Sequence, residues 1–138
     1  MHAVSRILLD NWIPNLQVSW VKEGLDVSRE LLGAGVNDMG GTLINESIST
    51  SAGAPFGQLV SPRTFRSMIR DAGRIPAERT TTYAIRRRYA NGEDGDDRLD
   101  AVESDSESRF GSYRQLVRLD QYRYRHPGRR GNASPESH

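Results

Sequence analysis

The chain of 138 residues contains no cysteine. This absence excludes disulfides, thiolate nucleophiles, cysteine-ligated zinc and an iron–sulfur cluster held by the chain's own residues. Histidine is scarce as well, and His2, His126 and His138 lie near the ends without metal-type spacing, so no metal site is expected. There is no apolar run near the roughly 20 residues that span a bilayer, nor an apolar signal-peptide core. We therefore expect a soluble, cytoplasmic protein.

Large aliphatic residues become sparse after Ala90. Acidic residues dominate 93–107 and arginines dominate 109–130, a segregation that the formal net charge of +1 hides. A hydrophobic content of 36% is lean for a chain that is packed throughout. The composition predicts a packed domain over residues 1–90 and a charged, poorly ordered tail over 91–138.

Two short apolar runs flank a helical pattern in the first half of the chain. Leu16–Val21 and Val36–Thr42 are predicted strands, because they are rich in β-formers and bounded by proline or glycine. Between them Asp26 is a candidate N-cap and Gly35 a candidate C-terminal stop, with Val27, Leu31 and Ala34 on one helix face. The order strand, helix, strand predicts two parallel neighbours joined by a right-handed crossover, and hence an α/β fold.

Three further segments have clear patterns. Val4, Ile7 and Leu8 have helical spacing within 3–9, and Arg79–Ile85 is extended and β-prone. The clearest helix opens with Ser61 as N-cap and Pro62 at the first position, followed by an apolar face of Phe65, Met68, Ile69 and Ala72 and then Gly73.

The predicted strands carry polar residues where a buried strand would carry Val or Ile. Gln17 and Ser19 alternate with apolar residues in the first strand. Since parallel strands in a barrel are covered on both faces, such groups need partners, and a substrate in the barrel mouth would provide them. Asn37, Asp38 and Thr42 follow the same logic in the second strand, and Gly40 and Gly41 would let the backbone approach a ligand. The alternative is that Asn37 and Asp38 cap or turn and that the glycine pair is a bulge.

Three separated blocks give the chain a family resemblance. "NLQVSWVKEG", "LLGAGVNDMGGTLINESISTSAGA" and "RTTTY" resemble, in order, the C-terminal part of the deazaflavin (FO) synthase branch of radical S-adenosylmethionine enzymes, in its archaeal form. The resemblance covers roughly Ala3 to Tyr83 and is greatest to the tyrosine-using subunit. Menaquinone-pathway enzymes share a block similar to "GVNDMGGT" and are the nearest alternative.

The resemblance implies a TIM-type barrel with chemistry at the carboxyl ends of its strands. It also implies S-adenosylmethionine and a [4Fe–4S] cluster held by a CxxxCxxC loop. The implied substrates are tyrosine and 5-amino-6-(D-ribitylamino)uracil, which accepts the tyrosine-derived hydroxybenzyl group.

This chain departs from the family pattern because the cluster cysteines and the early strands are absent. A complete barrel takes roughly 200–250 residues, so we expect the C-terminal βα units of an incomplete barrel. We expect a truncated gene product or one half of a split protein, inactive alone and needing the missing N-terminal barrel portion or a partner subunit.

For each candidate substrate-binding residue, a purely structural role is the alternative to contact with substrate. Gln17 and Ser19 could contact uracil or the amino-acid head group, or merely fill the barrel. Trp20 could wall the pocket or pack in the core, and Glu46 could face the pocket or cap a helix. Arg79 could pair with a carboxylate or clasp the barrel. The candidates, with no catalytic residue assigned, are Gln17, Ser19, Trp20, Asn37, Asp38, Gly40, Gly41, Thr42, Glu46 and Arg79.

A small non-enzymatic binding protein is the second hypothesis. Arginine and tyrosine interleave in "RRRY" at 86–89 and in "YRYRHPGRR" at 122–130, as they do on nucleic-acid-binding surfaces. Such runs are more often solvated, and the acidic stretch between them would repel phosphate. We therefore do not expect nucleic acid or membrane as a partner.

Overall fold

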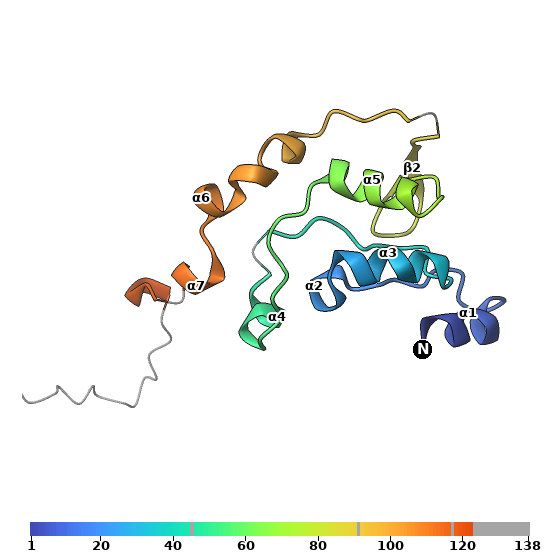
Figure 1. Ribbon diagram of the computed structural model, residues 1–138, viewed down its shortest axis with the longest axis horizontal. Coiled ribbons are helices and arrows are strands. Elements are labelled where there is room, and N and C mark those ends of the chain that lie inside the picture. Colours follow the sequence, from blue (N-terminus) through green and yellow to red (C-terminus); the bar gives the residue numbers. More distant parts are fainter. Residues whose placement is uncertain (45, 91, 117, 123–138) are drawn as a thin grey trace, which may run out of the picture.

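A computed structural model describes residues 1–44, 46–90, 92–116 and 118–122 (Figure 1). Helices and 3₁₀ turns alternate with long connections, and the named strands in this part form a two-stranded antiparallel sheet. The elements are α1 (His2–Leu9), α2 (Trp20–Glu23), α3 (Leu25–Gly33), α4 (Ser47–Ser51), α5 (Pro62–Asp71), β1 (Ala77–Arg79), β2 (Ile85–Arg88), η1 (Arg98–Ala101), η2 (Glu103–Asp105), α6 (Ser106–Phe110), α7 (Tyr113–Leu116) and η3 (Asp120–Tyr122).

The two predicted parallel segments do lie side by side, but they are not strands of the predicted length. Gln17 and Asp38 form a single parallel bridge. Val18 donates its N–H to the Asp38 carbonyl at 2.9 Å, and Asp38 donates to the Leu16 carbonyl at 3.2 Å. From Trp20 the chain turns into α2, which buries Trp20 and Val21 in the core. The parallel pairing is confirmed, whereas the continuous strands Leu16–Val21 and Val36–Thr42 are wrong because a helical turn buries the apolar end of the first segment.

Helix α3 joins these segments as predicted, with a different buried face. It begins at Leu25, directly after Gly24 at φ +81°, so Asp26 lies in the first turn and is not the N-cap. Ser28 and Leu32 are buried, whereas Val27 is 42% exposed, which makes the predicted Val27 face wrong. The Ser28 hydroxyl can be buried because it donates to the Gly24 carbonyl at 2.6 Å. The predicted stop at Gly35 (φ +98°) is confirmed.

Helix α5 has the predicted start and face. Ser61 Oγ accepts from the Thr64 N–H, Pro62 occupies the first helical position, and Phe65 and Met68 are buried. Phe65 meets Trp20 edge to face, with ring centroids 5.8 Å apart, which ties α5 to α2. The core comprises Val18, Trp20, Val21, Leu32, Val36, Met39, Val60, Phe65 and Met68.

The extended run predicted over Arg79–Ile85 is wrong, since it contains a turn between β1 and β2. Thr80 donates its N–H to the Ala84 carbonyl at 2.9 Å, and its hydroxyl accepts the Ala84 N–H at 3.1 Å. Tyr83 sits in the turn at φ +65°, the one positive φ of a non-glycine residue in the described part. Threonine hydroxyls satisfy the turn locally, which a β-propensity pattern does not reveal.

The mixture of helices and short strands agrees with the α/β class, and the barrel stays a prediction.

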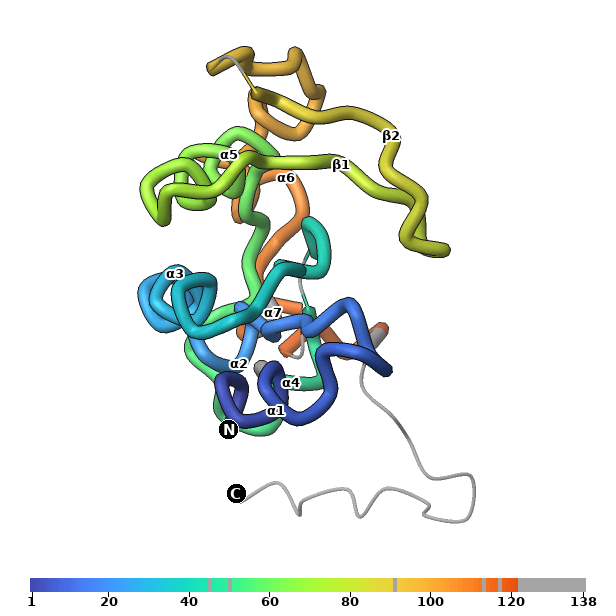
Figure 2. The backbone as a smooth tube through the Cα atoms, turned by 90° about the vertical axis from the view of Figure 1, so that its right-hand side faces the viewer, coloured from blue at the N-terminus to red at the C-terminus, as the bar shows by residue number. Residues whose placement is uncertain are grey.

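Helix α1 is confirmed, but its apolar face is uncovered. Val4, Ile7 and Leu8 are 56%, 79% and 70% exposed. The helix lies at the edge of the molecule (Figures 1 and 2) and is held there by Arg6, whose Nε donates to the Gly35 carbonyl at 2.8 Å. None of the described helices has the length and hydropathy needed to cross a bilayer.

After β2 the chain returns past α5 before reaching α6 (Figures 1 and 2). Asp94, Asp100 and Glu103 contact α5 or its N-cap residue from this segment. The domain boundary near Ala90 stays a prediction. Most of the arginine–tyrosine run at 122–130 lies outside the described residues.

Candidate functional site

Asp38 and Arg79 form the centre of the candidate site. Arg79 Nη2 lies 2.7 Å from Asp38 Oδ2, and the two side chains are 22% and 7% exposed. Asp38 Oδ1 accepts the Gly40 N–H at 2.8 Å, and Arg79 Nη1 donates to the Thr80 carbonyl at 3.0 Å. The bridge to Gln17 fixes the Asp38 backbone, and β1 ends at Arg79. A carboxylate and a guanidinium from distant segments are therefore held together in a largely desolvated place.

Tyr83 completes this arrangement, and sequence reasoning assigned it no role. The Arg79 guanidinium lies over its ring, 4.3 Å from the centroid. Such cation–π contact favours one orientation of the guanidinium. The positive φ of Tyr83 is a strained conformation of the kind that clusters at binding sites. The feature of the sequence that could have identified Tyr83 is its place in the "RTTTY" block.

Gln17 borders the same place. Its side chain is exposed, and a Cβ added at Gly40 would lie 3.0 Å from Gln17 Nε2. Gly40, at φ +77°, therefore leaves room for this amide beside Asp38. We call Gln17, Asp38, Gly40, Arg79 and Tyr83 the Asp38 cluster.

Other candidates have structural partners. Trp20 is buried in the core and donates its indole N–H to the Gly41 carbonyl at 3.0 Å. Core packing therefore accounts for Trp20, and this hydrogen bond accounts for Gly41. Glu46 accepts the Ile48 and Ser49 amides at 3.2 and 2.7 Å, which is helix capping at α4.

Asn37 points away from the Asp38 cluster, toward α1. Its Oδ1 accepts from the Leu16 N–H at 2.8 Å and from Arg6 Nη2 at 3.0 Å. Its Nδ2 donates to the Pro14 carbonyl at 3.0 Å, so the amide clasps the connection after α1. Ser19 is exposed at the start of α2, and Thr42 is half-buried.

The chain's residues do not fit an iron–sulfur cluster. It has no cysteine, and the described part holds no group of three or more His, Cys, Asp or Glu side chains able to bind a metal ion. A groove of about 300 Å³ between α3 and α5 contains none of the candidates; Leu25, Asp26, Arg29, Thr64, Ser67, Met68 and Asp71 line it.

The Asp38 cluster brings hydrogen-bond donors and acceptors together. An arginine offers five N–H donors, and the buried Nε–H of Arg79 has no partner within the described residues. The exposed Gln17 amide adds a donor and an acceptor. These groups suit a ligand with a carboxylate or an amide-like ring edge.

Known proteins are similar to the part of the chain that holds the Asp38 cluster. The family described as "CofH/MqnC C-terminal region" matches residues 1–91. A 5-amino-6-(D-ribitylamino)uracil--L-tyrosine 4-hydroxyphenyl transferase 1 of Methanosarcina barkeri is 52% identical over 83 residues, which are 60% of this chain and 22% of that protein. The transferase of Archaeoglobus fulgidus is 48% identical over 85 residues, 62% of this chain and 25% of that protein.

The chain thus spans about a quarter or less of the length of these two relatives. No solved structure matches. Because the family match covers residues 1–91, well over half of the sequence, the chain belongs to the CofH/MqnC C-terminal region family.

Proposed function

We propose that this chain supplies the C-terminal part of a radical S-adenosylmethionine transferase of FO biosynthesis. The observation that carries the proposal is the identity of about half to archaeal 4-hydroxyphenyl transferases over 83 to 85 residues, together with a family match over residues 1–91, which contain the Asp38 cluster. In that reaction a tyrosine-derived hydroxybenzyl group joins 5-amino-6-(D-ribitylamino)uracil. The family description also includes MqnC, so a menaquinone-pathway enzyme is the second candidate.

The role proposed for this chain is to bind and orient substrate. Arg79 would present its guanidinium, whose plane is fixed by Asp38 and Tyr83, to a carboxylate or ring edge of the substrate. Gln17 would hydrogen-bond a uracil edge or an amino-acid head group. Gly40 would give backbone access beside Asp38, whereas Trp20, Asn37, Gly41 and Glu46 have the structural partners described above.

The [4Fe–4S] cluster and S-adenosylmethionine would supply the radical chemistry from outside this chain. No described residues of this chain fit an iron–sulfur cluster, so we assign no step through it. A companion carrying the cysteines is required, and the exposed apolar face of α1 is the surface proposed to meet it. Burying Val4, Ile7 and Leu8 there would contribute roughly 1.5–3 kcal/mol for each fully covered side chain.

Complementation tests the proposal. The Methanosarcina barkeri relative, expressed without its matched C-terminal region and reconstituted anaerobically, would be mixed with this chain, tyrosine, 5-amino-6-(D-ribitylamino)uracil and S-adenosylmethionine. We expect the hydroxybenzyl adduct only when both proteins are present. Arg79→Lys should abolish most turnover, because lysine has no second N–H edge, whereas Arg29→Lys on α3 should not. No adduct from a folded mixture would refute the function.

The nucleic-acid hypothesis gains no support from the described part of the arginine–tyrosine run. Arg86 pairs with Glu78 at 2.9 Å, and Arg87 pairs with Glu93 at 3.5 Å and stacks on Tyr89. The expectation that nucleic acid is not a partner stays a prediction.

A further inference from the structure

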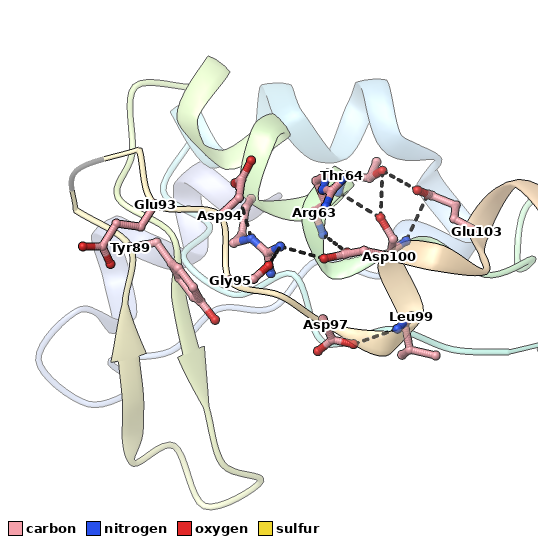
Figure 3. Close-up of polar contacts among 12 residues, drawn as sticks. Arg63, Thr64, Tyr89, Glu93, Asp94, Gly95, Asp97, Leu99, Asp100 and Glu103 are labelled. Carbon is pink, nitrogen blue, oxygen red and sulfur yellow. Dashed lines mark hydrogen bonds and ion pairs between the residues drawn. The ribbon is translucent and has the colours of Figure 1, made fainter.

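The arginines of α5 face an acidic segment that follows the family-matched residues. Arg63, Arg66 and Arg70 recur at helical spacing on α5. Residues 93–103, here called the acidic clasp, run beside the helix from its last turn to its first (Figure 3). The family match ends at residue 91, before the clasp begins.

At the last turn of α5 the clasp is held by Arg70. Arg70 Nη1 lies 2.9 Å from Asp94 Oδ1, and Nη2 donates to the Glu93 carbonyl at 2.7 Å. The hydrogen bond from Arg70 is the main reason that the pKa of Asp94 lies below its ordinary value. Both groups are partly exposed, so salt weakens this contact.

At the middle of α5 the contact is buried. Arg66 Nη2 donates to the Gly95 carbonyl at 2.9 Å and to Asp100 Oδ2 at 3.0 Å. The Arg66 and Asp100 side chains are 6% and 3% exposed. The Arg66 guanidinium also lies over the Tyr89 ring, 5.1 Å from its centroid. A buried charge is strongly destabilising when its partner is removed, so α5 depends on Asp100.

At the first turn the clasp satisfies amides that a helix leaves without internal partners. Asp100 Oδ1 accepts the Arg63 N–H at 2.7 Å, and Glu103 Oε1 accepts the Ser61 N–H at 3.0 Å. Thr64 bonds Ser61 Oγ through its N–H and Glu103 Oε2 through its hydroxyl. Pro62 has no N–H, so every amide from 61 to 64 is satisfied.

We propose that the acidic clasp holds α5 in place and closes the Arg66 and Arg70 side chains to other anions. Its carboxylates act as an internal anionic ligand, neutralising Arg66 and Arg70 and capping the helix start. The acidic clasp lies outside the family-matched residues, and this proposal does not depend on the proposed enzymatic function.

Amide hydrogen exchange on the full chain tests the acidic clasp. Amides of a first helical turn normally exchange readily because they lack intrahelical partners. We expect Ser61 and Arg63 amides to exchange at least about tenfold more slowly than unstructured peptide, and Asp100→Ala, which removes the acceptor of the Arg63 N–H, to abolish that protection at Arg63. Asp96→Ala is the matched control, because Asp96 is exposed in the same segment and takes no part in these contacts.

The proposal would be overturned if the Ser61 and Arg63 amides of the unmodified chain exchanged freely. It would also be overturned if the substitutions at Asp100 and Asp96 had equal effects on exchange of the Arg63 amide. Should Asp100→Ala unfold the chain, the unmodified protein and Glu103→Ala still decide the matter. Glu103→Ala removes the acceptor of the Ser61 N–H, so it should expose the Ser61 amide and leave Arg63 protected.

A binding measurement tests the closure of the Arg66 and Arg70 side chains. Heparin should bind the folded variant Asp94→Asn/Glu103→Gln at least about tenfold more tightly than the unmodified chain, with affinity falling as salt rises. Asp96→Asn/Asp97→Asn removes the same formal charge and should leave heparin affinity nearer that of the unmodified chain. Equal gains in both double variants, or no gain in either, would contradict closure.

Discussion

At the scale of single residues, the two adjacent glycines near Asp38 have different constraints. Gly40 is at φ +77° with Gln17 Nε2 only 3.0 Å from a built Cβ, whereas a Cβ at Gly41 meets nothing within 4 Å. Gly40→Ala should therefore lower the free energy of unfolding by about 1–2 kcal/mol, and Gly41→Ala by less than about 0.5 kcal/mol. Urea denaturation monitored by tryptophan fluorescence checks the pair. Equal losses would show that the left-handed turn at Gly40 is not as described.

Removing the charge of Asp38 should be costly. Asp38→Asn keeps an acceptor for the Gly40 N–H but leaves Arg79 without its counter-ion. We expect a loss of about 1–3 kcal/mol in urea denaturation. Asp26→Asn, whose carboxylate is 93% exposed, should cost less than about 0.5 kcal/mol. A negligible effect of Asp38→Asn would contradict the ion pair.

Sequence reasoning selected Asp38 and Arg79 but did not pair them. They lie 41 positions apart, and no local pattern specifies which distant charges meet. For Trp20, Asn37 and Glu46 the plainer alternative describes the observed contacts, since each satisfies nearby backbone groups. Polar residues within apolar runs thus indicate that these side chains need hydrogen-bond partners. They do not indicate whether a ligand or the backbone provides those partners.

At the scale of elements, α5 offers the cleanest test of local sequence rules. Ser61→Ala removes the hydroxyl that accepts the Thr64 N–H and should lower the free energy of unfolding by about 1 kcal/mol. Ser67→Ala, at an exposed position inside the same helix, should be neutral or slightly stabilising. Thermal unfolding followed by circular dichroism measures both. Equal midpoints for the two variants would count against the cap.

The start of α5 should also make stability depend on pH. Burial would raise the pKa of Glu103, but hydrogen bonds from Ser61 and Thr64 outweigh it and hold the pKa below the ordinary 4.5. The contribution of Glu103 is therefore complete above about pH 4.5 and is lost as the pH falls through the lower folded value. Urea midpoints measured from pH 6 to pH 3 should fall less steeply for Glu103→Gln. An unchanged slope would exclude a contribution from Glu103.

Helices were predicted more accurately than strands, for a physical reason. Caps such as Ser61 and Gly35 act locally, so their positions can be recognised in the sequence. A strand needs neighbours, and Leu16–Val21 pairs at one bridge before its apolar end turns helical. The long-range partners of Arg66 in the acidic clasp could not be predicted from a segment that reads as a charged tail.

At the scale of the whole molecule, the exposed face of α1 is the feature that most needs a partner. Its three apolar side chains are each more than half exposed, although the helix is firmly attached through Arg6. Ile7→Asp should leave the chain's own urea midpoint nearly unchanged, because Ile7 is 79% exposed. A large drop in that midpoint would show that α1 packs within this chain.

The central claim is that this chain completes a larger enzyme, and complex formation tests it most directly. Sedimentation velocity of the chain with the Methanosarcina barkeri relative lacking its matched C-terminal region should show a one-to-one complex. Ile7→Asp should weaken that complex at least about tenfold, and Lys22→Asp on α2 should not. Separate sedimentation of the two folded proteins, or a complex indifferent to Ile7→Asp, would contradict the account.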